Sequence, residues 1–272
     1  MTHPASLRPP PRPVDKARLR AAFSRGATAY DAHARVQRAV VERVLALAAR
    51  HAPAPRRALD VGAGTGVLLE ALLARHPGLA ATGVDLAHGM ARAARDRTGP
   101  RHLVGDAEAL PVASGTLDLA LSSSVFQWLP TLGPAVTEVA RVLAPGGSFV
   151  LALFGDDTLH ELHAAWSTAL PSGVSDRTHR FHRRTDVEAA VAAAGLELVH
   201  LDAERHVEHH ADVLSLLRTM RAMGAGNASP ERPRALSEAH VVARMIAAYE
   251  RLRAPEGIPA TWDVIYAVAR RR

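Results

Sequence analysis

The sequence contains no cysteine and a single lysine, Lys16. The absence of cysteine excludes disulfides, thiolate nucleophiles, cysteine-bound zinc and iron–sulfur clusters. None of its 272 residues lie in an uninterrupted apolar run of about 20, the length that a membrane-spanning helix needs. We therefore expect a soluble protein, and the missing cysteines agree with a cytoplasmic location.

Positive charge is in modest excess, with a net charge of +6. The arginines that supply it are scattered among alanines, which favours a solvated basic surface over a nucleic-acid site. The same surface suits an acidic protein partner, because opposite charges speed encounter. Residues 1–13 are rich in proline and arginine without the apolar centre of a secretory signal, and we expect them to form a disordered tail.

Hydrophobic periodicity indicates one domain over residues 14–272. Apolar residues at helical spacing predict helices over 16–50, and short apolar strands then alternate with amphipathic helices up to residue 154. This alternation predicts an α/β, Rossmann-like fold: a mostly parallel seven-stranded sheet with helices on both faces. Two later segments, 156–181 and 211–256, depart from this alternation of strands and helices, and we expect them to form an inserted helical cap.

The first predicted strand ends in a glycine loop with the sequence LDVGAGTG over residues 59–66. Gly62, Gly64 and Gly66 let the main chain turn tightly and approach a ligand at a helix N-terminus. The third glycine comes one residue too early for the dinucleotide fingerprint, and the Gly-Lys-Ser/Thr of a phosphate loop is absent. Asp60 adds negative charge, which suits a cationic or amine-bearing ligand.

Polar residues also follow three later strands. Asp85 stands where a ribose-binding acid is expected, and the other strand-end residues are Asp106, Ala107, Ser122 and Ser123. In open α/β sheets ligands bind outside the carboxyl ends of the strands, so these residues are predicted to line one site. A single acid such as Asp106 could instead cap the following helix.

In this combination the sequence resembles the class I methyltransferases. Further stretches resemble one family among them, the malonyl-acyl-carrier-protein O-methyltransferases of biotin synthesis. Those stretches lie at 22–31 with Gln37, 105–108, 122–128, 143–147, 154–159 and 217–225. Members of that family often have cysteine where this chain has Ala63, a departure of small weight because the main chain does the binding.

The resemblance implies S-adenosylmethionine as cofactor, bound by the glycine loop. It places the ribose on Asp85 and the adenine beside Asp106 and Ala107, with Leu86 and Met90 flanking it. It also implies that Tyr30 and Gln37, from the N-terminal helices, close the site around the methionine portion. Core packing remains an alternative for Met90 and Tyr30.

The implied reaction is methylation of the free carboxylate of a malonyl group on acyl-carrier protein. A carboxylate is ionised at pH 7, so no general base is needed, and no metal is expected. Tyr30, Gln127 and Arg218 are the candidate catalytic residues. Gln127 and Trp128 are predicted to line the transfer pocket, with packing as the alternative role for Trp128. Arg218, with Arg221 second, is predicted to hold the carboxylate, unless these arginines are merely solvated. The partner would be the acidic carrier protein, with no nucleic acid or membrane, and the enzyme a monomer.

Two other functions fit parts of the sequence. A protein-arginine hydroxylase or assembly factor of the same fold shares the region 154–159 and the ending Pro259-Ala260-Thr261, whereas Gln127-Trp128 and Leu217-Arg218 favour the methyltransferase. A non-catalytic S-adenosylmethionine-binding protein would bind the cofactor without turning over an acyl substrate.

Overall fold

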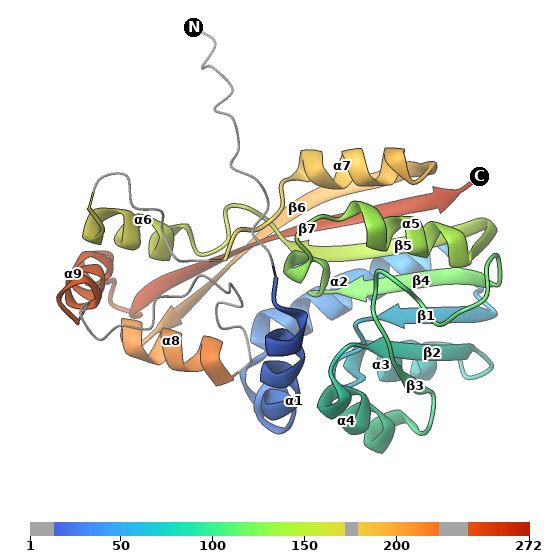
Figure 1. Cartoon of the computed structure of the whole chain (residues 1–272), viewed down its shortest axis with the longest axis horizontal. Helices are drawn as coiled ribbons and strands as arrows, with labels where there is room; N and C mark the ends of the chain where they lie inside the picture. The colour runs from blue at the N-terminus through green and yellow to red at the C-terminus, as the bar shows by residue number, and fades with distance from the viewer. Residues whose placement is uncertain (1–13, 172–178, 223–238) are drawn as a thin grey trace, which may run out of the picture.

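The computed structural model describes residues 14–171, 179–222 and 239–272. A seven-stranded sheet runs through it in the order β3-β2-β1-β4-β5-β7-β6 (Figure 1). The strands are β1 (Arg57–Val61), β2 (Ala80–Asp85), β3 (His102–Val104), β4 (Leu117–Ser123), β5 (Leu143–Phe154), β6 (Leu196–His210) and β7 (Ile258–Arg271). Strands β1 to β5 pair in parallel, and β7 is antiparallel to β5 and β6. The predicted mostly parallel, seven-stranded sheet is confirmed.

Helices cover both faces of this sheet, as predicted. One face is packed by α2 and α3, and the other by α5 and α7. The helices are α1 (Lys16–His33), α2 (Arg35–His51), α3 (Val67–Arg75), α4 (His88–Thr98), α5 (Gly133–Val142), α6 (His160–Ala169), α7 (Arg184–Ala193), α8 (Val213–Ala222) and α9 (Ala239–Glu250), with a 3₁₀ turn, η1 (Phe126–Trp128).

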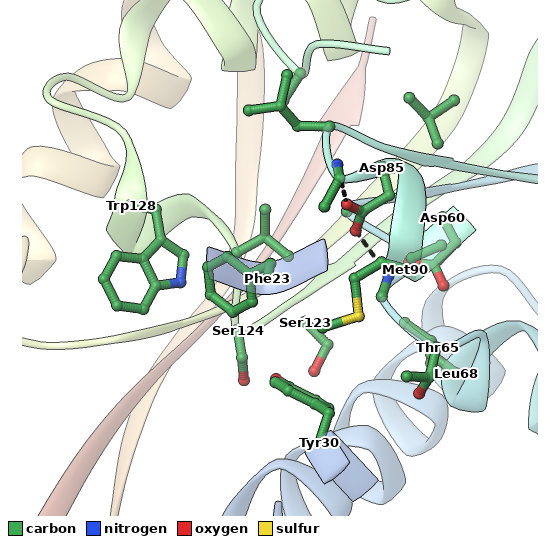
Figure 2. A pocket seen from close by; sticks show the side chains of 18 of the residues that line it. Phe23, Tyr30, Asp60, Thr65, Leu68, Asp85, Met90, Ser123, Ser124 and Trp128 are labelled. Atoms are coloured by element: carbon green, nitrogen blue, oxygen red, sulfur yellow. Dashed lines mark hydrogen bonds between the residues drawn. The ribbon is translucent and has the colours of Figure 1, made fainter. Parts of the chain in front are cut away.

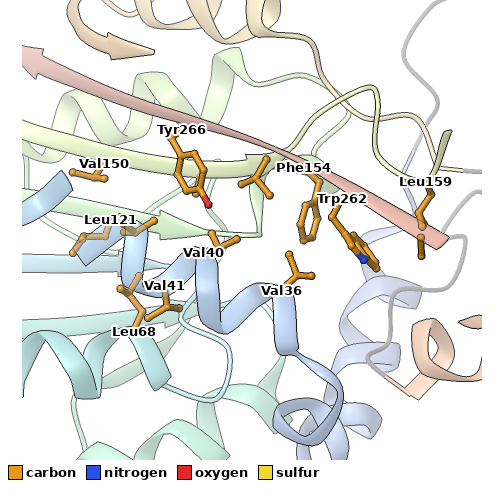
Figure 3. Packing of buried hydrophobic residues seen from close by; sticks show 14 of the residues in the cluster. Val36, Val40, Val41, Leu68, Leu121, Val150, Phe154, Leu159, Trp262 and Tyr266 are labelled. Atoms are coloured by element: carbon orange, nitrogen blue, oxygen red, sulfur yellow. The ribbon is translucent and has the colours of Figure 1, made fainter. Parts of the chain in front are cut away.

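Helix α2 lies on the sheet because its apolar residues recur every three to four positions and so share one face. Val36, Val40 and Val41 are at most 8% exposed and belong to the same buried cluster as Phe154 and Tyr266 (Figure 3). Complete burial of such a side chain is worth about 1.5–3 kcal/mol. This packing holds the start of α2, and with it the end of α1, above the sheet.

The order of the strands determines where a ligand can bind. From β1 the chain moves outward through β2 and β3, and then returns to place β4 on the other side of β1. The crossover connections therefore leave in opposite directions at β1 and β4, which opens a crevice at their carboxyl ends. Val61 ends β1 and Ser123 ends β4, so the segments that follow these two strands both lie at this crevice.

Helices α6, α8 and α9 lie beyond the carboxyl ends of β1 and β4, beside the ends of the long β6–β7 ribbon (Figure 1). Helix α6 packs on α9, and α8 contacts α1. They fall within the segments predicted to form a cap, although residues 172–178 and 223–238 of those segments, like the predicted tail 1–13, lie outside the described residues. Within the described ranges, no helix is long and apolar enough to cross a membrane.

The core beneath the site should govern stability. Phe149 in β5 is 1% exposed and its ring lies 5.7 Å from that of Phe126, in the cluster covered by α5 and α7. We expect Phe149→Ala to lower the free energy of unfolding by about 3–5 kcal/mol, because it leaves a cavity that the core cannot fill. Urea denaturation followed by circular dichroism measures the change.

Val207→Ala, at a side chain that is 53% exposed, is the control. It should change the free energy of unfolding by less than about 0.5 kcal/mol. Equal losses in both variants would contradict this account of the core.

Candidate functional site

The glycine loop between β1 and α3 follows a path that only glycine adopts without strain. Gly62 and Gly64 have φ angles of 76° and 54°, in the left-handed region. A Cβ atom on Gly62 would stand 2.3 Å from Val125 Cγ2, so the loop packs directly against the segment after β4. At Gly64 a Cβ would meet nothing within 4 Å, so its main chain faces open space.

That open space is a cavity of about 310 Å³ at the carboxyl ends of β1 to β4. Its volume falls in the range of small-molecule sites. Helix α1 and the start of α2 form one wall, and the glycine loop and the ends of β2, β3 and β4 form the rest. Figure 2 places Asp60 and Asp85 on one side of it and Phe23 and Trp128 on the other. The cavity therefore has an acidic side and an aromatic side.

Asp60 supplies an uncompensated carboxyl group to the acidic side. It is 1% exposed, and its Oδ2 atom has no hydrogen-bond partner among the described residues. Burial, together with the negative charge of Asp85, raises the pKa of Asp60 to about 8. A buried carboxylate without a partner is unfavourable, so this site favours a ligand that brings a positive charge.

Asp85 connects the end of β2 to the glycine loop. Its carboxylate accepts hydrogen bonds from the main-chain nitrogens of Gly64, at 2.9 Å, and Ala87, at 2.7 Å (Figure 2). Burial raises the pKa of Asp85, and these two bonds partly offset that increase. Each carboxylate oxygen can accept a second hydrogen bond, so Asp85 can still receive hydroxyl groups of a ligand.

Lys16, the single lysine of the chain, attaches the start of α1 to the end of β3. Its Nζ atom lies 2.5 Å from Asp106 Oδ2 and also forms an ion pair with Glu108. Partial burial lowers the pKa of Lys16, but the two carboxylates outweigh it and the net pKa is raised. The ammonium thus offsets one of the two negative charges at this end of the cavity.

A second network attaches the end of α1 to the glycine loop. Asp31 accepts a hydrogen bond from Thr65 Oγ1 at 2.7 Å and pairs with the guanidinium of Arg97. Arg97 also donates to the Thr65 carbonyl at 2.9 Å and to Glu70. Helix α1 is therefore held at both ends, and the cavity lies beneath it.

Aromatic rings form the side of the cavity opposite Asp60. Phe23 on α1 and Trp128 in η1 stack edge to face with centroids 5.5 Å apart, and Phe23 lies 6.4 Å from Tyr30. Burial, with the negative charges of Asp85 and Asp31, raises the pKa of Tyr30. Tyr30 is consequently a neutral phenol that can donate a hydrogen bond.

Eleven of the residues predicted from the sequence line this one cavity. They are Tyr30, Gln37, Asp60, Gly62, Gly64, Asp85, Leu86, Met90, Asp106, Ala107 and Ser123. Four predicted residues do not line it. Gly66 directly precedes α3 as its N-cap, and Ser122 donates to the Val61 carbonyl at 2.8 Å. Gln127 is 2% exposed and donates to the Ser124 carbonyl, and Arg218 is exposed on α8.

The lining residues that sequence reasoning did not single out as site residues include Lys16, Phe23, Asp31, Thr65 and Ser124. Lys16, Phe23 and Asp31 lie on α1, and tertiary packing decides which side chains of that helix face the strand ends. Phe23 and Asp31 did fall in a stretch that carried the family resemblance. Ser124 directly follows two predicted serines, and its φ of 59° was not visible in the sequence.

Strand order, one antiparallel strand, a glycine loop and acids at three strand ends together define a class I methyltransferase. A family model described as a methyltransferase domain matches residues 59–151. The chain belongs to the malonyl-acyl-carrier protein O-methyltransferase family. It is 49% identical over 266 residues to the enzyme of that name from Geobacter sulfurreducens. The alignment covers 95% of this chain and 100% of that relative. The resemblance noted in the sequence is thereby confirmed.

Two further proteins resemble the chain, one in sequence and one in fold. The biotin biosynthesis bifunctional protein BioHC of Cellvibrio japonicus is 35% identical over 263 residues, or 94% of this chain and 50% of that protein. The crystal structure of geranyl diphosphate C-methyltransferase from Streptomyces coelicolor, in complex with magnesium, geranyl diphosphate and S-adenosyl-L-homocysteine, aligns with a TM-score of 0.53 at 15% identity. That alignment covers 88% of this chain and 81% of that one, and shows a shared fold.

The buried acid of the cavity should make stability depend on pH. Asp60 has a pKa of about 8 in the folded protein, whereas an unfolded aspartate titrates near about 4. The stability that its protonated form contributes is therefore lost as pH rises through about 8. We expect Asp60→Asn to raise the Tm of the ligand-free protein more at pH 9 than at pH 5, measured by differential scanning fluorimetry. Asp96→Asn, at an exposed position on α4, is the matched control; an equal gain at both pH values for Asp60→Asn would contradict the expected titration.

Proposed function

We propose that this protein transfers a methyl group from S-adenosylmethionine to the free carboxylate of a malonyl thioester on acyl-carrier protein, an early step of biotin synthesis. The observation that carries this proposal is the 49% identity to a malonyl-acyl-carrier protein O-methyltransferase across that enzyme's whole length. The relative that is named for biotin biosynthesis supports the same pathway.

The residues of the cavity fit S-adenosylmethionine. Its ammonium group would meet the unpartnered Oδ2 of Asp60, and its ribose hydroxyls the remaining acceptor positions of Asp85. Met90 and Leu86 would lie against the adenine, beside Ala107. The bound donor supplies a methyl group on a sulfonium, and the exposed main chain at Gly64 lets it approach the loop closely.

The chain then has to orient the acceptor rather than activate it. A malonyl carboxylate is already ionised at pH 7, so the transfer requires no general base. Correct alignment of nucleophile and methyl carbon can provide several kcal/mol of barrier reduction. Because the reaction neutralises opposite charges, exclusion of water by α1 and the rings of Phe23 and Trp128 favours the less polar transition state.

Helix α8 supports a role in binding the carrier protein. The Arg218 side chain is exposed, and α8 contacts α1, whose Arg20 is exposed at the cavity. We propose that these guanidinium groups attract the acidic carrier protein and guide its acyl group toward the cavity. In this arrangement Arg218 acts on the carrier protein and not on the malonyl carboxylate.

Methyl transfer from labelled S-adenosylmethionine tests the function. We expect a methyl ester on malonyl-acyl-carrier protein and none on acetyl-acyl-carrier protein, which lacks the free carboxylate. No product despite measurable cofactor binding would contradict the proposal and favour a non-catalytic binding protein.

Arg218→Ala tests the proposed role of Arg218 in binding the carrier protein. We expect it to raise the KM for malonyl-acyl-carrier protein by about threefold to tenfold, in keeping with an exposed charge pair. Activity on malonyl-pantetheine should stay unchanged, because that small thioester lacks the acidic protein. Arg56→Ala, at the opposite end of the sheet just before β1, is the matched control. An equal loss with both acceptors would show instead that Arg218 holds the carboxylate.

A further inference from the structure

Ser124 has a backbone conformation that serine seldom adopts. Its φ of 59° lies in the left-handed region, where only Leu159 joins it among the described non-glycine residues. Such a conformation is unfavourable by about 1–3 kcal/mol and persists when neighbouring groups impose it; it often occurs at functional sites. The position therefore requires an explanation beyond local turn formation.

Two hydrogen bonds impose this conformation. The Ser124 nitrogen donates to the Ala152 carbonyl at 2.9 Å, and the Gln127 side chain donates from Nε2 to the Ser124 carbonyl at 2.7 Å. Gln127 is 2% exposed and does not line the cavity, so its contact with the site passes through Ser124.

The imposed conformation leaves a buried hydroxyl at the wall of the cavity. Ser124 is 8% exposed, lines the cavity, and has an Oγ atom without a hydrogen-bond partner among the described residues. A buried hydroxyl left without a partner is unfavourable by about 1–3 kcal/mol. This hydroxyl is thus available to a bound molecule.

Ser124 lies in the part of the cavity where the methyl acceptor would bind. The side chain of Val125, the next residue, lies against Gly62 of the glycine loop. Figure 2 shows Ser124 on the side of Phe23 and Trp128, away from Asp85. The hydroxyl therefore lies between the loop that would hold the donor and the aromatic side where the acyl group would enter.

The basic side chains of the cavity are mostly engaged elsewhere. Lys16 pairs with the acids after β3, Arg97 pairs with Asp31, and Arg38 donates to the Asp31 carbonyl at 2.6 Å. Arg20 is exposed. A neutral hydroxyl can orient a carboxylate while reducing its nucleophilicity less than a tight ion pair would, because it leaves the charge on the oxygens.

We propose that the Ser124 hydroxyl donates a hydrogen bond to one oxygen of the acceptor carboxylate, and that Gln127 is a positioning residue that holds the Ser124 main chain. This inference rests on the proposed function. The other carboxylate oxygen attacks the methyl carbon: the O–CH₃ bond forms as the S–CH₃ bond breaks, its electron pair stays on sulfur, and no proton moves. The Ser124 proton remains on the serine throughout.

A pair of substitutions separates the hydroxyl from the backbone. Ser124→Ala removes the hydroxyl and keeps Cβ, whereas Ser124→Gly removes both and relaxes the left-handed conformation, so it folds readily. We expect both to lower kcat/KM for malonyl-acyl-carrier protein by about 10- to 100-fold, as for loss of a hydrogen bond to a charged group. The Kd for S-adenosyl-L-homocysteine, measured by calorimetry, should stay within about twofold of the native value. A native rate in Ser124→Ala would overturn the proposal.

Binding without turnover gives a second measurement. With S-adenosyl-L-homocysteine bound, the native enzyme should bind malonyl-acyl-carrier protein more tightly than acetyl-acyl-carrier protein. Both Ser124 variants should lose this preference and leave the affinity for the acetyl form unchanged. Weaker binding of both forms would indicate a merely structural effect and refute the assigned contact.

Gln127→Leu tests the positioning role through a double-mutant cycle. We expect it to lower kcat/KM for malonyl-acyl-carrier protein in the native background and to have little further effect in Ser124→Gly, because both act through one hydroxyl. Independent, additive losses would contradict that role. Failure of the native enzyme to methylate malonyl-acyl-carrier protein would refute the proposed function itself, whereas native activity with active Ser124 variants would refute only this inference.

Discussion

The site depends on one close approach, between the main chain at Gly62 and the side chain of Val125. Any other residue type at position 62 would strain the left-handed backbone and force Val125 to move, since a Cβ would stand 2.3 Å from Val125 Cγ2. This contact brings the loop after β1 against the segment after β4, at the point where the strand order reverses. The loop, its two acids and Ser124 consequently share a single cavity.

The charges of the cavity follow from that geometry. Acids at neighbouring strand ends lie close together, and the chain compensates them unequally. Lys16 pairs with both Asp106 and Glu108, whereas the Oδ2 atom of Asp60 has no hydrogen-bond partner among the described residues. The uncompensated acid reduces the stability of the free protein at high pH and improves the site for a cationic ligand. Stability and binding are thus in opposition at this one residue.

The aromatic side of the cavity serves a different purpose from the acidic side. Phe23 and Trp128 come from segments that are far apart in sequence, and their edge-to-face contact joins α1 to η1. Together with the hydrogen bonds of Asp31, this contact keeps α1 over the strand ends. An enclosed space results in which orientation, rather than acid or base chemistry, can promote transfer to an already ionised acceptor.

Local patterns were sufficient to predict the sheet, the glycine loop and the acids at the strand ends. Parallel strands present their carboxyl ends at one edge, so residues such as Asp60 and Asp85 could be assigned to one site without coordinates. The sequence pattern was less informative about the direction in which a side chain points. Ser122 and Ser123 were grouped together, yet successive strand residues point to opposite faces, and Ser122 bonds to the Val61 carbonyl instead of facing the cavity.

The sequence by itself therefore determined the fold class, the family and most of the acidic side of the site, because these depend on residue type and on spacing along the chain. Tertiary structure alone decided that Lys16, Phe23 and Asp31 of α1 line the cavity, that Arg218 lies exposed on α8, and that Gln127 reaches the site only through Ser124. Such contacts join residues far apart in sequence or depend on a single backbone angle, and neither composition nor periodicity encodes them.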